Sequence, residues 1–419
     1  MRISSAQIFN IANNSIADAN AALIKTQEQL STGRRVLTPS DDPVASTKIL
    51  SIERELGNVE QFRRNIDAAK NNLVLEESIL DGVTNIVQRM QELAIQAGNT
   101  ATLSESEYTS LANEVDSRLG ELTNLLNSQN ANGDYIFGGY KSTEEPFSGD
   151  ISTGFRYQGD EGQQFIQVAN NTKVAASDSG KHIFVDIESS SNTINTSGSS
   201  ANRANPPANI SIGQVTDQDA YDEFYPEDIV ITFNEDSNIV PAGKNFTARE
   251  RSTGRVIAAD QRFVQGADIQ MEGVSFRIVG NPASGTPTQT GDQFFIESTQ
   301  KQDILTTVAR FSEAMKSYDG TDESRDTVSS IVAATIDNLS NAQTSVLETV
   351  STLGARFNTL ESTEQLHLDS ELVSQEVLSS LRDVNYSEAA TRLSAQTLIL
   401  EAAQASFVRV SRLTLFSQL

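Results

Sequence analysis

The side chains best suited to catalysis or metal binding are scattered through this sequence. Its two histidines, His182 and His367, are 185 residues apart, one in an expected strand and the other in an expected helix. A histidine that acts as a base or a metal ligand needs a second functional group beside it. No nucleotide-binding glycine motif occurs either. We therefore expect a protein that is not an enzyme, with no cofactor and no catalytic, cofactor-binding or metal site.

Clustered charges provide two weaker candidates for binding. None of the acidic pairs has the alternate-residue spacing of a calcium loop closed by a glutamate, so a solvated acidic surface is the favoured interpretation. These pairs are Asp222-Glu223, Glu227-Asp228 and Glu235-Asp236. The Arg34-Arg35 pair could hold an anion, but Asp41 and Asp42 follow closely. Ion pairing within this segment is therefore expected.

Composition excludes several classes of protein. The 419 residues include 31 basic and 56 acidic side chains, a net charge of −25, and 37% are apolar. That balance is too acidic for nucleic-acid binding and too apolar for general disorder. Without cysteine there is no disulfide and no thiolate-bound metal. We expect no cleavable signal peptide, because residues 1–30 lack a charged region followed by an unbroken apolar run. We expect no membrane insertion, because no apolar run reaches about 18 residues.

Both ends of the chain carry apolar residues at alternating spacings of three and four. This pattern is typical of a coiled-coil seam. Residues 1–43 hold four basic and four acidic side chains and residues 382–419 hold four and three, so the acidic excess lies between the ends. Apolar residues on further faces, such as Ile24 and Leu398, indicate helices that are buried on more than one side. We expect subunit assembly through Phe9, Ile16, Leu23, Leu30, Leu393, Leu400, Phe407 and Val410.

Helical periodicity extends inward from both ends. The first helix is expected from about residue 5 to 30, ended by Gly33, and a second is expected from Pro43, capped by Asp42, to about residue 97. Ser104 and Glu107 have capping-box spacing and open a third, which continues until Asn132-Gly133. Helical periodicity returns near residue 304, breaks at 319–320 and continues toward 384.

The middle of the chain has a composition typical of β structure. Residues 138–291 contain 16 of the 24 glycines and 7 of the 9 prolines. Short apolar runs lie between these turns and predict strands: 165–168, 183–187, 229–233, 274–279 and 294–296. Residues 189–209 are rich in Ser and Asn and contain two adjacent prolines, so we interpret them as a linker.

The predicted fold class is α+β. A long antiparallel helical bundle or coiled-coil rod is made of both chain ends, with one or two antiparallel β domains inserted. The expected divisions are terminal assembly helices at 1–44 and 384–419, a helical rod at 45–137 and 301–383, a first β subdomain at 138–188, a linker at 189–209, and a second β subdomain at 210–300.

Three segments resemble the bacterial flagellin family. Residues 30–47 read LSTGRRVLTPSDDPVAST, similar to the segment that follows the first helix in that family. Within it, TPSDDPVA resembles the hook–filament junction branch, because filament flagellins typically carry Ala-Gly after the paired Asp. Residues 132–147, NGDYIFGGYKSTEEPF, resemble that branch's exit into its β domain. The ending LTLFSQL resembles the tail of junction proteins.

The resemblance implies a secreted structural subunit at the hook–filament junction of the bacterial flagellum, exported by the flagellar type III apparatus. The implied partners are further copies of itself in a ring, hook-associated protein 1 and flagellin as neighbours, and an export chaperone on the C-terminal helix. A filament flagellin is the first alternative. A coiled-coil adaptor outside the flagellum is the second, but it leaves the inserted β module unexplained.

Overall fold

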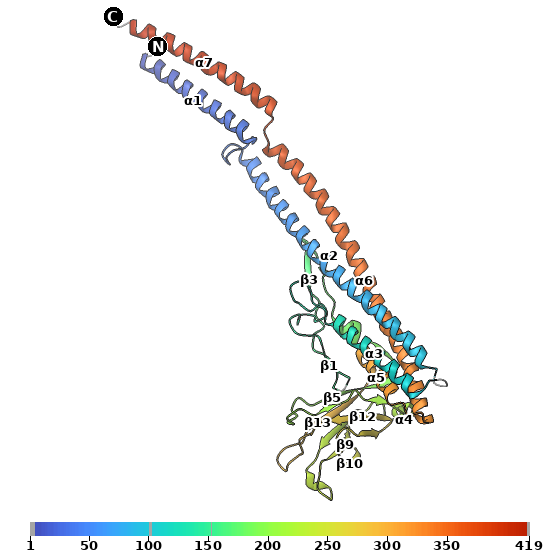
Figure 1. Cartoon of the computed structure of the whole chain (residues 1–419). Helices are drawn as coiled ribbons and strands as arrows, with labels where there is room; N and C mark the ends of the chain where they lie inside the picture. The colour runs from blue at the N-terminus through green and yellow to red at the C-terminus, as the bar shows by residue number, and fades with distance from the viewer. Residues whose placement is uncertain (1–4, 100–102, 152, 417–419) are drawn as a thin grey trace. The chain divides into compact units, whose positions relative to one another are not determined.

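The computed structural model describes residues 5–99, 103–151 and 153–416 (Figure 1). The chain divides into two compact units, called here the terminal unit, residues 1–65 with 361–419, and the central unit, residues 66–360. The fold class is the expected one. Helices from the two halves of the chain pack antiparallel, and antiparallel sheets are inserted between those halves in sequence.

Four helical segments build the terminal unit. α1 (Ser5–Thr32) packs along α7 (Tyr386–Phe416), as Figure 1 shows in blue and red. The other two segments are residues 43–65 of α2 (Pro43–Ala97) and residues 361–382 of α6 (Asp322–Arg382). The start of α2 follows the sequence prediction, because Pro43 opens the helix and the Asp42 carboxylate accepts the Ala45 N–H at 3.0 Å.

The helical core of the central unit combines residues 66–97 of α2 and 322–360 of α6 with two shorter helices. These are α3 (Glu105–Leu126) and α5 (Ile304–Lys316). α3 starts at the expected capping box of Ser104 and Glu107, but it ends at Leu126, six residues before the expected Asn132-Gly133. The α2 residues on the bundle-facing side are fully buried at regular spacings of three and four: Ile66, Ala69, Leu73, Glu76, Leu80, Val83, Val87, Met90, Ala94 and Ala97.

Two antiparallel hairpins and a short helix pack directly on this helical core. The hairpins are β1 (Phe147–Asp150) with β2 (Gly154–Tyr157), and β3 (Phe165–Ala169) with β4 (Thr172–Ala175). The buried side chains of Phe147, Val168 and Val174 belong to the same apolar cluster as the helices. The expected strand at 183–187 was wrong, and with it the placement of His182 in a strand. Residues 181–185 form the short helix η1 (Lys181–Val185), which buries Ile183 and Phe184 in the helical core.

The remaining strands enclose a second apolar core. The five-stranded sheet has the order β10 (Val256–Arg262), β9 (Asn245–Glu250), β8 (Ile229–Phe233), β13 (Gln293–Lys301) and β5 (Glu188–Gly198). The smaller sheet has the order β11 (Asp268–Met271), β12 (Val274–Val279) and β6 (Asn209–Ile210), and β7 (Gln214–Val215) also pairs with β12. Two short helices, α4 (Gln218–Phe224) and η2 (Asp236–Asn238), connect strands. The expected strands at 229–233, 274–279 and 294–296 are present.

The expected linker at 189–209 was wrong in its first half, which β5 occupies. Pairing with β13 and burial of Thr193 and Ile194 outweigh the polar composition. The buried Arg310 of α5 fixes this strand, donating to Thr193 Oγ1 at 2.7 Å and to the Ile194 carbonyl at 2.6 Å. Burial lowers the pKa of Arg310 to about 10. Within the expected linker, residues 199–208 have no regular strand or helix.

Candidate assembly site at the paired terminal helices

The seam between α1 and α7 brings together most of the residues expected to mediate assembly. The Phe9 and Phe407 rings lie 5.1 Å apart between centroids, although Phe9 remains 50% exposed. Half-buried side chains occupy the other expected positions that the structure describes: Ile16, Leu23, Leu30, Leu393 and Leu400. The Val410 side chain and the LTLFSQL tail lie outside the described side chains. The two chain ends therefore share one seam that is covered only partly.

Apolar side chains also lie on the outer faces of both helices. Ile24 is 60% exposed and Leu398 is 68% exposed, with Ile11 and Ile399 close to these values. Large apolar side chains gain free energy when they leave water, at about 25 cal/mol per Å². Faces of this kind on a helix pair are typical of surfaces that another chain covers.

Among the seam side chains that the structure describes, deeper burial is found only toward the base, near the turn into α2. Thr26 and Gln29 on α1 and Ala389 on α7 are buried. Their polar groups are satisfied locally: Thr26 Oγ1 donates to the Ala22 carbonyl at 3.1 Å, and Gln29 Nε2 donates to the Arg35 carbonyl at 2.6 Å. The seam is thus best packed beside the turn and more open along the helices toward the chain ends.

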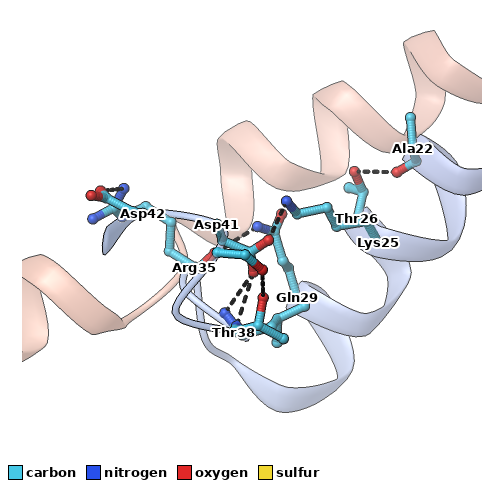
Figure 2. Close-up of polar contacts among 10 residues, drawn as sticks. Ala22, Lys25, Thr26, Gln29, Arg35, Thr38, Asp41 and Asp42 are labelled. Atoms are coloured by element: carbon cyan, nitrogen blue, oxygen red, sulfur yellow. Dashed lines mark hydrogen bonds and ion pairs between the residues drawn. The ribbon is translucent and has the colours of Figure 1, made fainter. Parts of the chain in front are cut away.

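The turn from α1 into α2 is held by its two aspartates (Figure 2). Asp41 receives the Lys25 ammonium at 2.6 Å and the Leu37 and Thr38 backbone N–H groups at 3.1 and 3.0 Å. The bond from Lys25, followed by that from Thr38, lowers the pKa of Asp41 to about 2. The pKa of Asp42 is also lowered, first by the Ala45 N–H that it caps and then by Arg35.

The sequence predicted the partner of one arginine in this turn and missed a partner of Asp41. Arg35 pairs with Asp42 at 3.3 Å, as expected. Asp41 pairs instead with Lys25, sixteen residues earlier on α1. A signal for that pairing exists, because Gly33 ends the helix and the loop that follows can fold back along the last turns of α1.

A short antiparallel bridge ties this turn to the break between α6 and α7. The Arg35 N–H donates to the Arg382 carbonyl at 2.7 Å, and the Val384 N–H donates to the Gly33 carbonyl at 2.8 Å. Gly33 has φ +71°, and a Cβ there would lie 3.0 Å from the Tyr386 hydroxyl oxygen. The α1–α2 turn and the α6–α7 break are therefore joined to each other by backbone hydrogen bonds, which the sequence pattern did not reveal.

Several of the side chains considered for catalysis or metal binding take part in ring stacking, hydrogen bonds or ion pairs. His367 is buried and stacks on Phe62 with ring centroids 5.5 Å apart, whereas His182 is exposed on η1. Asp222 accepts from Asn192, and Asp228 pairs with Arg251. In the described part of the chain, no group of three or more His, Cys, Asp or Glu residues is arranged to hold a metal ion, and no described helix meets the length and hydropathy of a membrane span.

Comparisons with known proteins agree with this architecture. The bacterial flagellin N-terminal helical region matches residues 3–142. Flagellar hook-associated protein 3 of Salmonella typhimurium is 36% identical over 189 residues, which are 45% of this chain and 58% of that protein. Flagellin of Escherichia coli is 30% identical over 134 residues, 30% of this chain and 27% of its own length. The chain thus matches little more than half the length of the Salmonella relative.

A solved structure extends the likeness beyond the ends of the chain. The crystal structure of flagellar hook-associated protein 3 from Legionella pneumophila is 28% identical to this chain, with a TM-score of 0.53. The match covers 80% of this chain and 98% of that one. In its matched N-terminal region, its paired terminal helices and this shared fold, the chain is similar to members of the bacterial flagellin family.

Proposed function

We propose that the protein is a structural subunit of the bacterial flagellum that forms the hook–filament junction by helical self-assembly. The observation that carries this proposal is the incompletely covered seam of α1 and α7, with apolar side chains such as Ile24 and Leu398 on the outer faces. Greater similarity to hook-associated protein 3 than to E. coli flagellin supports the junction over the filament.

In this proposal, neighbouring subunits bury the faces that α1 and α7 leave exposed. The assembly residues are Phe9, Ile16, Leu23, Leu30, Leu393, Leu400, Phe407 and Val410. Copies of the chain form a ring, with hook-associated protein 1 on the hook side and flagellin on the filament side. An export chaperone covers the C-terminal helix before assembly, where Leu398 and Ile399 form an exposed apolar pair. The subunit acts as an adaptor and performs no catalysis.

Deletion of the gene tests this function. A strain without the junction protein is expected to build hooks but to release flagellin into the medium, because the filament has no subunit on which to begin. Electron microscopy of the cells and immunoblotting of the medium measure the two effects. A deletion strain that has hooks but contains no flagellin at all, inside or outside the cell, would identify the chain as the sole filament flagellin instead.

A further inference from the structure

One position in the buried stripe of α2 holds a carboxylic acid. Glu76 lies between Leu73 and Leu80, where the spacing of the stripe calls for an apolar residue, and its side chain is 0% exposed. Neither of its carboxyl oxygens has a hydrogen-bond donor in bonding geometry. An ionised carboxylate left this way would carry a large desolvation cost.

The nearest charged groups come from two other elements packed against α2. Asp178 lies in the loop between β4 and η1, and Arg356 lies on α6. The Arg356 guanidinium holds both oxygens of Asp178, at 2.7 and 2.8 Å, and Gln163 donates to Asp178 at 2.6 Å. This two-oxygen geometry is typical of an ionised carboxylate. A cavity of about 500 Å³ adjoins the pair and is also lined by the ionisable residues Glu161, His182, Asp186 and Glu348.

The surroundings of Glu76 favour its neutral form. Burial raises its pKa to about 8, and the negative charge of Asp178 acts in the same direction, against the smaller opposing effect of Arg356. Two carboxyl groups side by side in a buried site are stable when one of them holds a proton. Because Arg356 already pairs with Asp178, the proton belongs on Glu76.

We propose that protonated Glu76 donates to Asp178, so that Glu76, Asp178 and Arg356 form a proton-dependent clasp between α2, α6 and the β4–η1 loop. That loop is also tied to its surroundings by Ser179, which donates to the Asp160 carbonyl at 2.6 Å, and by the Gly180 N–H, which donates to the Phe137 carbonyl at 3.0 Å. The clasp therefore fastens the hairpin region β1–β4 to the helical core. It is independent of the flagellar role proposed above.

The pH dependence of this clasp has a definite sign. In the closed state Glu76 keeps its proton up to a pKa of about 8, whereas in an opened state exposed to water the ordinary value of 4.5 applies. Between these values the closed state binds more protons, so rising pH favours opening by up to about tenfold per pH unit. Below about pH 4.5 the clasp is tightest, and above about pH 8 the effect levels off.

Hydrogen exchange of the full-length protein tests the clasp. Protection of backbone amides in residues 176–185 is measured from pH 5 to 8 and corrected for the intrinsic exchange rate at each pH. The wild-type protein is expected to lose protection steadily across this range. Glu76→Gln should show almost constant protection, because the amide donates to Asp178 at every pH.

Two further variants complete the experiment. Glu76→Leu fits the apolar stripe, is expected to fold, and should also be insensitive to pH. Glu114→Gln, which removes a part-exposed carboxylate of α3 that pairs with Arg89 of α2, should keep the wild-type slope. The clasp is refuted if wild-type protection does not change with pH, if both Glu76 variants keep the slope, or if Glu114→Gln abolishes it.

Discussion

Both units of this protein contain helices with apolar residues at spacings of three and four, but these residues are buried to different extents. In the central unit, the α2 stripe from Ile66 to Ala97 is fully buried by α3, α5, α6 and the hairpins. In the terminal unit, the seam of α1 and α7 has equivalent spacing, yet residues such as Leu23 and Leu400 are only half-buried. Heptad spacing alone therefore does not distinguish a completed core from a surface that a further chain can cover.

This difference in burial indicates that one unit mainly stabilises the monomer and that the other provides a surface for assembly. A fully buried stripe stabilises the chain that contains it, whereas a half-covered seam leaves apolar area whose burial can stabilise an oligomer. The central unit should consequently fold in isolation, and the terminal unit should reach its full stability only among neighbouring subunits.

The largest expected effect comes from placing a carboxylate in the buried α2 stripe or in the α1–α7 seam. Leu80→Asp should abolish folding of the central unit, because an unpaired charge in a fully buried site costs several kcal/mol. Leu400→Asp should leave thermal unfolding of the monomer nearly unchanged but abolish incorporation into the flagellum. Circular dichroism of purified monomers and a motility complementation assay measure the two outcomes.

Gln404→Asp is the matched control, since it introduces the same group at an exposed position of α7. It should fold and should support at least partial motility. Normal motility with Leu400→Asp, or early melting of that monomer, would contradict the division between stability and assembly.

Limited proteolysis should give the next largest contrast. In dilute monomer, cleavage is expected first within residues 1–37 and 384–419, because the half-covered seam opens locally at low cost. A resistant fragment containing the central unit should remain, and mass spectrometry identifies its ends. Both termini surviving as long as the β domains would show that the α1–α7 seam is already complete in the monomer.

A smaller effect is expected at the bridge between the α1–α2 turn and the α6–α7 break. Gly33→Ala forces an alanine to φ +71° and brings its Cβ to the Tyr386 hydroxyl, so it should destabilise the bridge by about 1–2 kcal/mol. Gly57→Ala, in a helical part of α2 with open space around it, should instead stabilise by about 0.5–1 kcal/mol. Urea unfolding followed by helical circular dichroism compares the two. Equal effects of the same sign would exclude a special role for Gly33.

The smallest expected effect is the loss of the Asp41 hydrogen bonds at low pH. The pKa of Asp41 is lowered from 3.8 to about 2, so its contribution to the turn is present above pH 4 and is lost as the pH falls toward 2. Asp41→Asn should show weaker protection of the Leu37 and Thr38 amides at pH 6 and less change on acidification. Hydrogen exchange measures both. Asp18→Asn, on the exposed face of α1, should behave as wild type.

The helical half of the fold could be predicted because its signals are local. Gly33, Asp42, Pro43 and the Ser104 capping box mark helix ends through interactions within a few residues. Spacing also identified which faces of α1 and α7 meet, as the contact of Phe9 with Phe407 confirms. Such features depend on little beyond the neighbouring sequence.

Features that depend on distant partners could not be predicted. β5 is a strand because β13 pairs with it and Arg310 binds its backbone, although its sequence is that of a linker. Residues 181–185 have the apolar content of a strand but form a helix against the helical core. Glu76 interrupts an otherwise apolar stripe, and its partners come from residues about 100 and 280 positions away. The position of the interruption was visible in sequence, but its meaning was not.

The bridge between Gly33 and Val384 has a consequence for the kinetics of assembly. It holds the bases of α1 and α7 together in one register, so the two helices meet at a high effective concentration. Starting a helix pair is the costly step, and each added turn is cheaper once the first is in place. In the proposed assembly, the bridge therefore acts as a nucleus, and pairing of α1 with α7 extends from it toward the chain ends as neighbouring subunits bind.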